Sequence, residues 1–117
     1  MAVLRIVANI AAEDPGAAAR FYREIFGLET LMDMGWIVTL GSGERHATQL
    51  SLMSEGGSGT PVPDISIEVD DLDETLARAR RAGYAPEYGP ADEPWGVRRF
   101  FVRDPSGKLV NVLAHAR

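Results

Sequence analysis

The sequence predicts an α+β fold built from two copies of a module with one strand, one helix and then two or three strands, and three observations support this prediction. An extended apolar stretch at residues 6–10 leads into Asp14 and a helical pattern, and residues 65–69 lead into Asp71 and a second helical pattern. The two aspartates are 57 residues apart, and the glycines that close the two helical patterns are 56 apart. Strand-like runs with Gly-containing turns follow each helical pattern. A duplicated unit of this kind predicts two related halves and a ligand cleft.

The first module is predicted over residues 1–54. Residues 3–10 form a strand, because apolar and polar side chains alternate along them. Asp14 is a good N-cap for a helix over residues 15–26, and Gly27 suits its C-terminal cap. The strand places Leu4, Ile6, Ala8 and Ile10 on one face. Further strands are expected over residues 35–40 and 48–53, with one more short strand within residues 28–34.

A segment rich in Gly, Ser and Pro separates the two modules at residues 55–63 and is predicted to be a linker. The second module covers residues 64–117 and begins with an alternating strand over residues 64–70. Asp71 and Glu74 then have the form of a capping box before a helix that Gly83 closes. The remaining expected elements are a short strand within residues 84–88, a loop over residues 87–94, and strands over residues 97–102 and 109–113.

Composition excludes several classes of protein. The chain of 117 residues is 45% hydrophobic and 25% charged, which is typical of a soluble domain. A net charge of −5 argues against a general nucleic-acid binder. There is no cysteine, so no thiolate metal site or disulfide framework is expected. The sequence shows no signal peptide and no apolar run that would span a membrane, and we expect a cytoplasmic protein.

Strand alternation separates the sheet faces that are expected to meet the helices from those that are not. Ile65, Ile67 and Val69 should face the second helix, and Leu50 and Leu52 the first. The opposite faces mix amides, carboxylates and apolar groups. Such a face is either simply hydrated or the lining of a cavity, and the apolar members favour the cavity. The residues on these faces are Arg5, Val7, Asn9, Gln49, Ser51, Met53, Asp64, Ser66, Glu68, Leu109, Asn111 and Leu113.

Three stretches resemble the vicinal oxygen chelate superfamily, which includes glyoxalase I, bleomycin-resistance proteins, fosfomycin-resistance enzymes and extradiol dioxygenases. Residues 9–28 resemble the opening of its first module, residues 65–72 (ISIEVDDL) that of its second, and residues 104–111 (DPSGKLVN) its closing turn and strand. Trp95-Gly96-Val97 is also typical. The resemblance implies two βαβββ modules that form a curved mixed sheet with the helices on its outer face. It also implies a homodimer whose cavities are built from modules of both chains.

The resemblance implies a metal position on the first and last strand of each module, where family enzymes place His or Glu. The matching residues here are Val7, Gln49, Asp64 and Asn111. Valine cannot bind a metal, and neutral amide oxygens are weak ligands for transition metals. His46 and His115 are expected to be solvated rather than ligands. We therefore predict no metal and no other cofactor, with a divalent metal as the alternative.

A cavity without the cation resembles the bleomycin-resistance branch, whose members bind an organic ligand. Trp36 and Trp95 would offer stacking surfaces, and Phe101 rather than Phe100 should face the cavity. Glu68 is expected to be a solvated carboxylate. The alternative function is a lyase, isomerase or transferase with a noncanonical divalent-metal site or an acid–base site, for which Asp64 is the best catalytic candidate. The predicted ligand-binding residues are Val7, Trp36, Gln49, Asp64, Trp95, Phe101 and Asn111.

Overall fold

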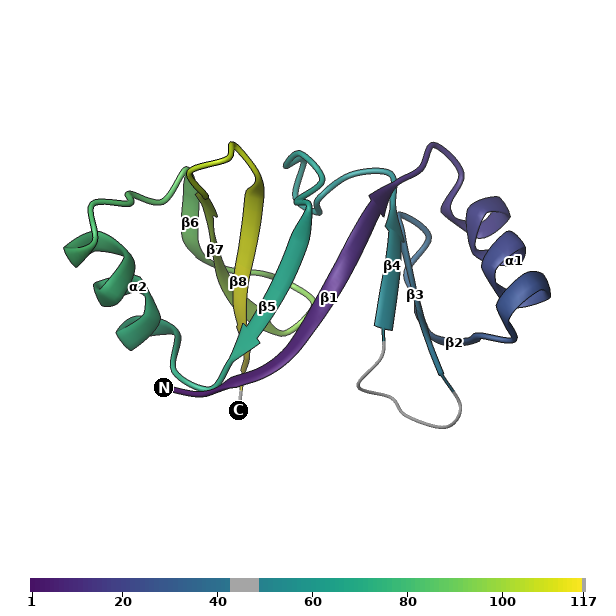
Figure 1. The fold of residues 1–117 in the computed structure, drawn as a ribbon, viewed down its shortest axis with the longest axis horizontal. Coiled ribbons are helices and arrows are strands. Elements are labelled where there is room, and N and C mark those ends of the chain that lie inside the picture. The colour runs from purple at the N-terminus through teal and green to yellow at the C-terminus, as the bar shows by residue number, and fades with distance from the viewer. Residues whose placement is uncertain (43–48, 117) are drawn as a thin grey trace. The chain divides into compact units, whose positions relative to one another are not determined.

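The computed structural model describes residues 1–42 and 49–116 of the chain (Figure 1). It confirms the predicted α+β class, because a strand–helix–three-strand order occurs twice. The first copy consists of β1 (Val3–Ala11), α1 (Pro15–Phe26), β2 (Glu29–Asp33), β3 (Ile37–Gly41) and β4 (Gln49–Met53). The second consists of β5 (Ile65–Val69), α2 (Leu72–Arg81), β6 (Tyr88–Asp92), β7 (Val97–Arg103) and β8 (Leu109–His115).

The chain divides into two compact units, here named the N-terminal unit (residues 7–62) and the C-terminal unit (residues 1–6 and 63–117). Strands follow the order β2-β3-β4-β1 in the N-terminal unit and β5-β8-β7-β6 in the C-terminal unit. The β1–β4 and β5–β8 pairs are parallel, and the other pairs within each unit are antiparallel. Each unit is therefore a mixed sheet with one helix on one face.

Helix α1 begins and ends where the sequence predicts. The Asp14 carboxylate accepts a hydrogen bond from the Ala17 N–H at 3.1 Å, and Gly27 ends the helix in the left-handed region with φ 67°. An N-cap of this kind is worth about 1 kcal/mol. The buried core beneath α1 contains Ala19, Val38, Leu40 and Leu52, with Leu50 packed against it. The predicted direction of Leu50 and Leu52 is confirmed.

Helix α2 covers the sheet of the C-terminal unit. The Asp71 carboxylate accepts a hydrogen bond from the Glu74 N–H at 3.0 Å, as the capping box predicts. Its apolar stripe packs on β5, β7 and β8. The core beneath it contains Val69, Leu72, Leu76, Phe100 and Val112. Because successive strand residues point to opposite faces, Phe101 points away from α2, as expected.

Strand β6 corrects two expectations. Residues 87–94 were expected to form a loop, and a short strand was expected within residues 84–88, but the structure places the strand at 88–92. The prediction failed because Gly89 and Pro90 are typical turn residues. An edge strand tolerates proline, since one side of it lacks a partner, and the register here shifts between Tyr88 and Ala91.

Strand β1 buries a different face from the one its apolar pattern suggests. Val7 is only 4% exposed, whereas Leu4 and Ile6 are 58% and 53% exposed. Helix α1 packs on β3 and β4 instead. Large apolar side chains also remain at the surface of the described chain, and we name six of them the exposed apolar set: Leu4, Ile6, Ile10, Phe21, Ile25 and Phe26.

Neither helix in the described ranges is long and apolar enough to cross a membrane.

Candidate ligand-binding site

The sheet face of the C-terminal unit that points away from α2 is the candidate site, and we name it the helix-distal face. Strand register arranges its residues in rows, because Asn111 lies opposite Phe101 on β7 and beside Ser66 on β5. The next row places Leu113 opposite Arg99 and beside Glu68. This face therefore contains an amide, a carboxylate and a guanidinium among apolar side chains.

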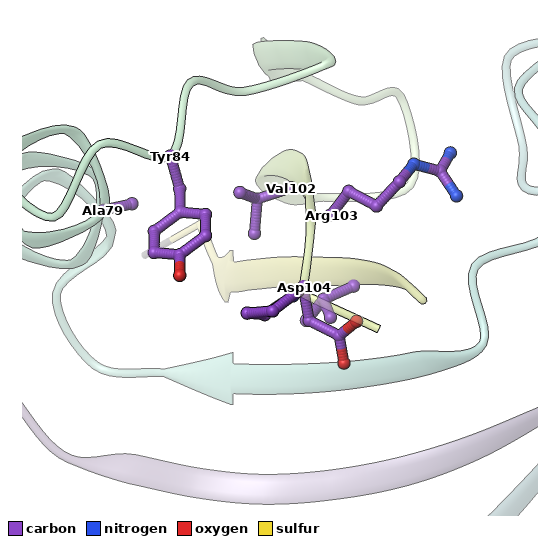
Figure 2. Close-up of a pocket in the computed structure, with 7 residues that line it drawn as sticks. Ala79, Tyr84, Val102, Arg103 and Asp104 are labelled. Atoms are coloured by element: carbon purple, nitrogen blue, oxygen red, sulfur yellow. The ribbon is translucent and has the colours of Figure 1, made fainter. Parts of the chain in front are cut away.

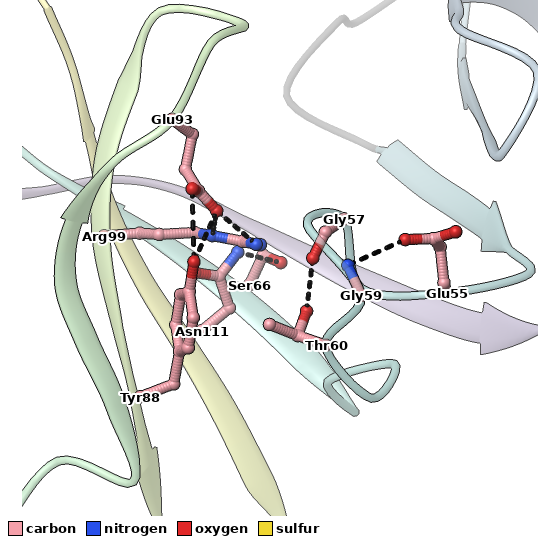
Figure 3. A network of polar contacts seen from close by, with 9 residues as sticks. All are labelled: Glu55, Gly57, Gly59, Thr60, Ser66, Tyr88, Glu93, Arg99 and Asn111. Atoms are coloured by element: carbon pink, nitrogen blue, oxygen red, sulfur yellow. Dashed lines mark hydrogen bonds and ion pairs between the residues drawn. The ribbon is translucent and has the colours of Figure 1, made fainter.

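Asn111 is the central polar group of this face. It is 8% exposed, and its side-chain N–H donates to the Ser66 hydroxyl at 3.0 Å (Figure 3). Its side-chain oxygen is buried and has no hydrogen-bond partner among residues 1–42 and 49–116. Leaving a buried acceptor unpaired costs about 1–3 kcal/mol. A donor from a bound molecule would recover that free energy.

A buried ion pair lies beside Asn111 on the same face. The Arg99 Nε–H donates to Glu93 Oε2 at 2.7 Å, and the two side chains are only 3% and 4% exposed. The Tyr88 hydroxyl lies 3.1 Å from each oxygen of Glu93 (Figure 3). The charges cancel within the pair, so this part of the face presents little net charge.

Three aromatic rings surround the Arg99 guanidinium. Its central carbon lies 4.7 Å from the centre of the Phe101 ring, 4.9 Å from Trp95 and 5.4 Å from Tyr88. Such cation–π contacts contribute about 0.5–2 kcal/mol when the cation is desolvated. Arginine thus organises Trp95, Phe101 and Tyr88 into one aromatic wall.

Asp64, the candidate catalytic residue, lies at the start of β5 and is exposed. Its backbone N–H donates to the Leu109 carbonyl oxygen at 2.8 Å, and its carboxylate accepts from the Leu109 N–H at 2.8 Å. The carboxylate therefore connects the beginnings of two parallel strands.

Glu68 is not the solvated carboxylate that was expected. Its side chain is 15% exposed and accepts hydrogen bonds from Arg5 Nε at 2.9 Å and from His115 Nδ1 at 2.7 Å. The His115 side chain itself is 53% exposed. The expectation for His46 lies outside the described residues.

The other predicted site residues belong to the N-terminal unit. Val7 is buried, and Trp36 and Gln49 are half-buried. Gln49 opens β4 opposite Gly41, two residues before Ser51. The Ser51 hydroxyl forms a 2.8 Å hydrogen bond with that of Thr39, and both residues are buried. The strand face of this unit that points away from α1 therefore also contains paired polar groups.

The structure groups the seven predicted residues into two sets, one in each unit. In the C-terminal unit it brings Phe101 and Asn111 opposite each other and places Trp95 against Arg99. Glu93 was not predicted from the sequence, and neither was the burial of Arg99 beside it. A signal was present, because Arg98 and Arg99 are adjacent on a strand, so one of them must point to the face opposite α2.

The donor set does not fit a transition metal. Among Val7, Gln49, Asp64 and Asn111, only Asp64 carries a charge, and its carboxylate already accepts a backbone hydrogen bond. Catalytic metal sites require about three good protein ligands. Within the described residues, no group of three or more His, Cys, Asp or Glu side chains is close enough to hold a metal ion.

A separate groove lies on the α2 side of the C-terminal unit (Figure 2). Its volume is about 260 Å³, and Ala79, Tyr84, Val102 and Val110 make it almost wholly apolar. Asp104 lies at its rim, where the Ser106 hydroxyl and the backbone N–H groups of Lys108 and Ser106 donate to its carboxylate. These hydrogen bonds, that of the Ser106 side chain foremost, lower the pKa of Asp104.

Two βαβββ modules, each with one helix on a mixed sheet, define the class of protein. The family model of the Glyoxalase/Bleomycin resistance protein/Dioxygenase superfamily matches residues 4–112. The chain therefore belongs to this superfamily. No curated protein sequence matches it.

Solved structures share the fold. Methylmalonyl-CoA epimerase from Streptomyces coelicolor is 23% identical over 99% of this chain and 100% of its own, with a TM-score of 0.72. A superfamily member from Vibrio splendidus is 16% identical over 97% and 99%, with a TM-score of 0.67. A Legionella pneumophila protein described as an NAD-dependent benzaldehyde dehydrogenase is 13% identical over 94% and 98%, with a TM-score of 0.76. At these identities the similarity establishes the fold.

Proposed function

We propose that the protein binds a small organic ligand on the helix-distal face without a metal ion, and that it sequesters an antibiotic or a toxic metabolite. The observation that carries this proposal is the buried, unpaired side-chain oxygen of Asn111. A native protein rarely leaves such an acceptor unsatisfied, and a donor on a bound molecule would satisfy it. Superfamily membership supports the proposal at the level of the fold.

The surroundings of Asn111 define the ligand's chemistry. The Asn111 oxygen requires an N–H or O–H donor, because it can only accept. Phe101 and Trp95 offer aromatic surface, and Leu113 lies next to Asn111 on the same face. The Arg99–Glu93 pair is internally neutralised, so it does not demand a charged partner. These features favour a largely apolar, planar ligand with a hydrogen-bond donor directed at Asn111.

Tryptophan fluorescence titration against a library of small aromatic compounds tests this proposal. The expected result is saturable binding that Asn111→Leu weakens about fivefold, since a single lost hydrogen bond is worth about 1 kcal/mol. Asp92→Asn is the matched control, because the Asp92 side chain is 81% exposed. Unchanged affinity in Asn111→Leu would show that its side-chain oxygen does not receive the ligand.

The alternative is a lyase, isomerase or transferase with a noncanonical divalent metal or with Asp64 as an acid–base residue. The similarity in fold to methylmalonyl-CoA epimerases keeps this alternative open. Elemental analysis of purified protein tests the metal-dependent form of this alternative, which stoichiometric Zn, Ni, Mn or Fe would favour. In metal-free protein, recovery of the library ligand unchanged after incubation would favour sequestration, whereas its conversion to a product that Asp64→Asn abolishes would favour the acid–base enzyme.

We also propose that the chain forms a homodimer. The exposed apolar set contains three side chains on α1 alone, with Phe21, Ile25 and Phe26 between 56% and 63% exposed. Large exposed apolar side chains gathered on one helix are typical of an interaction site. Sedimentation velocity should show a dimer that Phe21→Glu with Ile25→Glu converts to a monomer.

A further inference from the structure

A histidine–glutamate–arginine cluster lies at one end of the helix-distal face, and neither the predicted site nor the proposed function uses it. Glu68 accepts from Arg5 with one carboxylate oxygen and from His115 Nδ1 with the other, at 2.9 and 2.7 Å. The Glu68 side chain is largely buried, whereas that of His115 is about half exposed. The carboxylate is thus held on both sides, and the imidazole extends from it toward solvent.

The hydrogen bond to Glu68 fixes the tautomer of His115. An ionised carboxylate has only acceptor atoms, so the proton of the 2.7 Å contact must belong to Nδ1. In a neutral imidazole, a proton on Nδ1 leaves a lone pair on Nε2. Nε2 has no hydrogen-bond partner within residues 1–42 and 49–116. The result is a base oriented by a carboxylate, as in many proton-transfer sites.

His115 lies on the same face as Asn111. Both are odd-numbered residues of β8, and Val97 on β7 is the cross-strand neighbour of His115. At about 3.3 Å per residue, the Cα atoms of Asn111 and His115 are roughly 13 Å apart. Leu113 lies between them, opposite Arg99. Along this face of β8, the Asn111 oxygen is a hydrogen-bond acceptor, Leu113 is apolar, and His115 is a base.

We propose that His115 is a proton-accepting residue of this site, with Glu68 as its positioning residue, and that the ligand carries a weakly acidic hydroxyl in addition to the donor that Asn111 requires. This inference rests on the proposed function. On binding, the O–H bond of the ligand breaks and its electron pair remains on oxygen. The proton moves to Nε2, so the bound pair is an oxyanion beside an imidazolium that Glu68 stabilises. No further reactant is required.

The first test needs no ligand. Long-range proton–nitrogen correlation spectra of the full chain at mildly alkaline pH report which ring nitrogen of His115 carries the proton, and His115→Asn assigns the signal. We expect Nδ1–H in the unmodified protein and a shift toward Nε2–H in Glu68→Leu. Glu74→Leu, which removes an exposed carboxylate on α2, is the matched control and should change nothing. An Nε2–H imidazole in the unmodified protein overturns the proposal.

The second test uses para-nitrophenol and its methyl ether, para-nitroanisole, which lacks the acidic proton. We expect the phenol to bind about tenfold more tightly than the ether, with the absorption band of the ionised phenol appearing on binding. His115→Asn should abolish this preference. Equal affinities, or a preference that survives in His115→Asn, overturn the proposal.

The outcomes also separate this inference from the proposed function. If library ligands bind in a manner that depends on Asn111 and ignores His115, the site stands and the role of His115 falls. If the unmodified protein binds none of the library ligands, both the proposed function and the role of His115 are overturned.

Discussion

Removing Glu93 should be among the most damaging single changes in the C-terminal unit. The Arg99 and Glu93 side chains are 3% and 4% exposed, so Glu93→Leu leaves a guanidinium without its counter-charge away from water. Breaking a buried pair in this way costs about 3–5 kcal/mol. Because domains are typically stable by only about 5–15 kcal/mol, the loss would consume a large part of the total.

The sequence supplies a matched control one residue away. Arg98 pairs with Asp92 at 3.4 Å, and these side chains are 42% and 81% exposed. Exposed pairs contribute about 0–1 kcal/mol, so Asp92→Leu should cost far less. The double variant Glu93→Leu with Arg99→Met should recover most of the loss, because well-packed apolar groups often replace a buried pair without cost.

Urea unfolding followed by circular dichroism measures the free energy of each variant. If Glu93→Leu costs no more than Asp92→Leu, the Arg99–Glu93 pair is not desolvated in solution. The three aromatic rings would then not enclose a desolvated Arg99 guanidinium.

Three further predictions concern stability. Hydrogen bonds lower the pKa of Asp104, so its ionised carboxylate stabilises the folded protein above the ordinary aspartate pKa, and this stabilisation is lost as pH falls through the lowered value. Asp104→Asn should therefore flatten the acid dependence of the free energy of unfolding in urea. Gly56→Ala should destabilise the folded protein by about 1–3 kcal/mol, since the added Cβ would lie 2.1 Å from the Pro61 carbonyl oxygen. Gly16→Ala in α1 should instead stabilise it by up to about 1 kcal/mol, because alanine favours a helix more than glycine does. Thr39→Val should cost about 1–3 kcal/mol of stability, because it removes the partner of the buried Ser51 hydroxyl. The double variant Thr39→Val with Ser51→Ala should recover much of that loss, and thermal unfolding of the single and double variants measures the difference.

Local signals were sufficient to predict most of the fold. Asp14 and Asp71 cap the two helices as their spacing indicates, because capping depends on residues within one turn. The period of two also predicted which side of β4, β5 and β8 meets a helix. These features depend on neighbours in the sequence and therefore leave a readable pattern.

The features that escaped prediction depend on contacts between distant or atypical residues. The bonds of Glu68 to Arg5 and His115 join segments 63 and 47 residues apart, and no local pattern reports them. Strand β6 was hidden because its turn-forming residues lie on an edge, where the usual penalty for proline does not apply. The exposed side chains of β1 escaped because alternation identifies an apolar face without showing what covers it.

Each compact unit contains one of the chain's two tryptophans, Trp36 in one and Trp95 in the other. Replacing either indole with phenylalanine therefore yields a protein whose emission reports on a single half of the molecule. Comparing the two melting curves would reveal whether the duplicated halves lose their structure together or in succession.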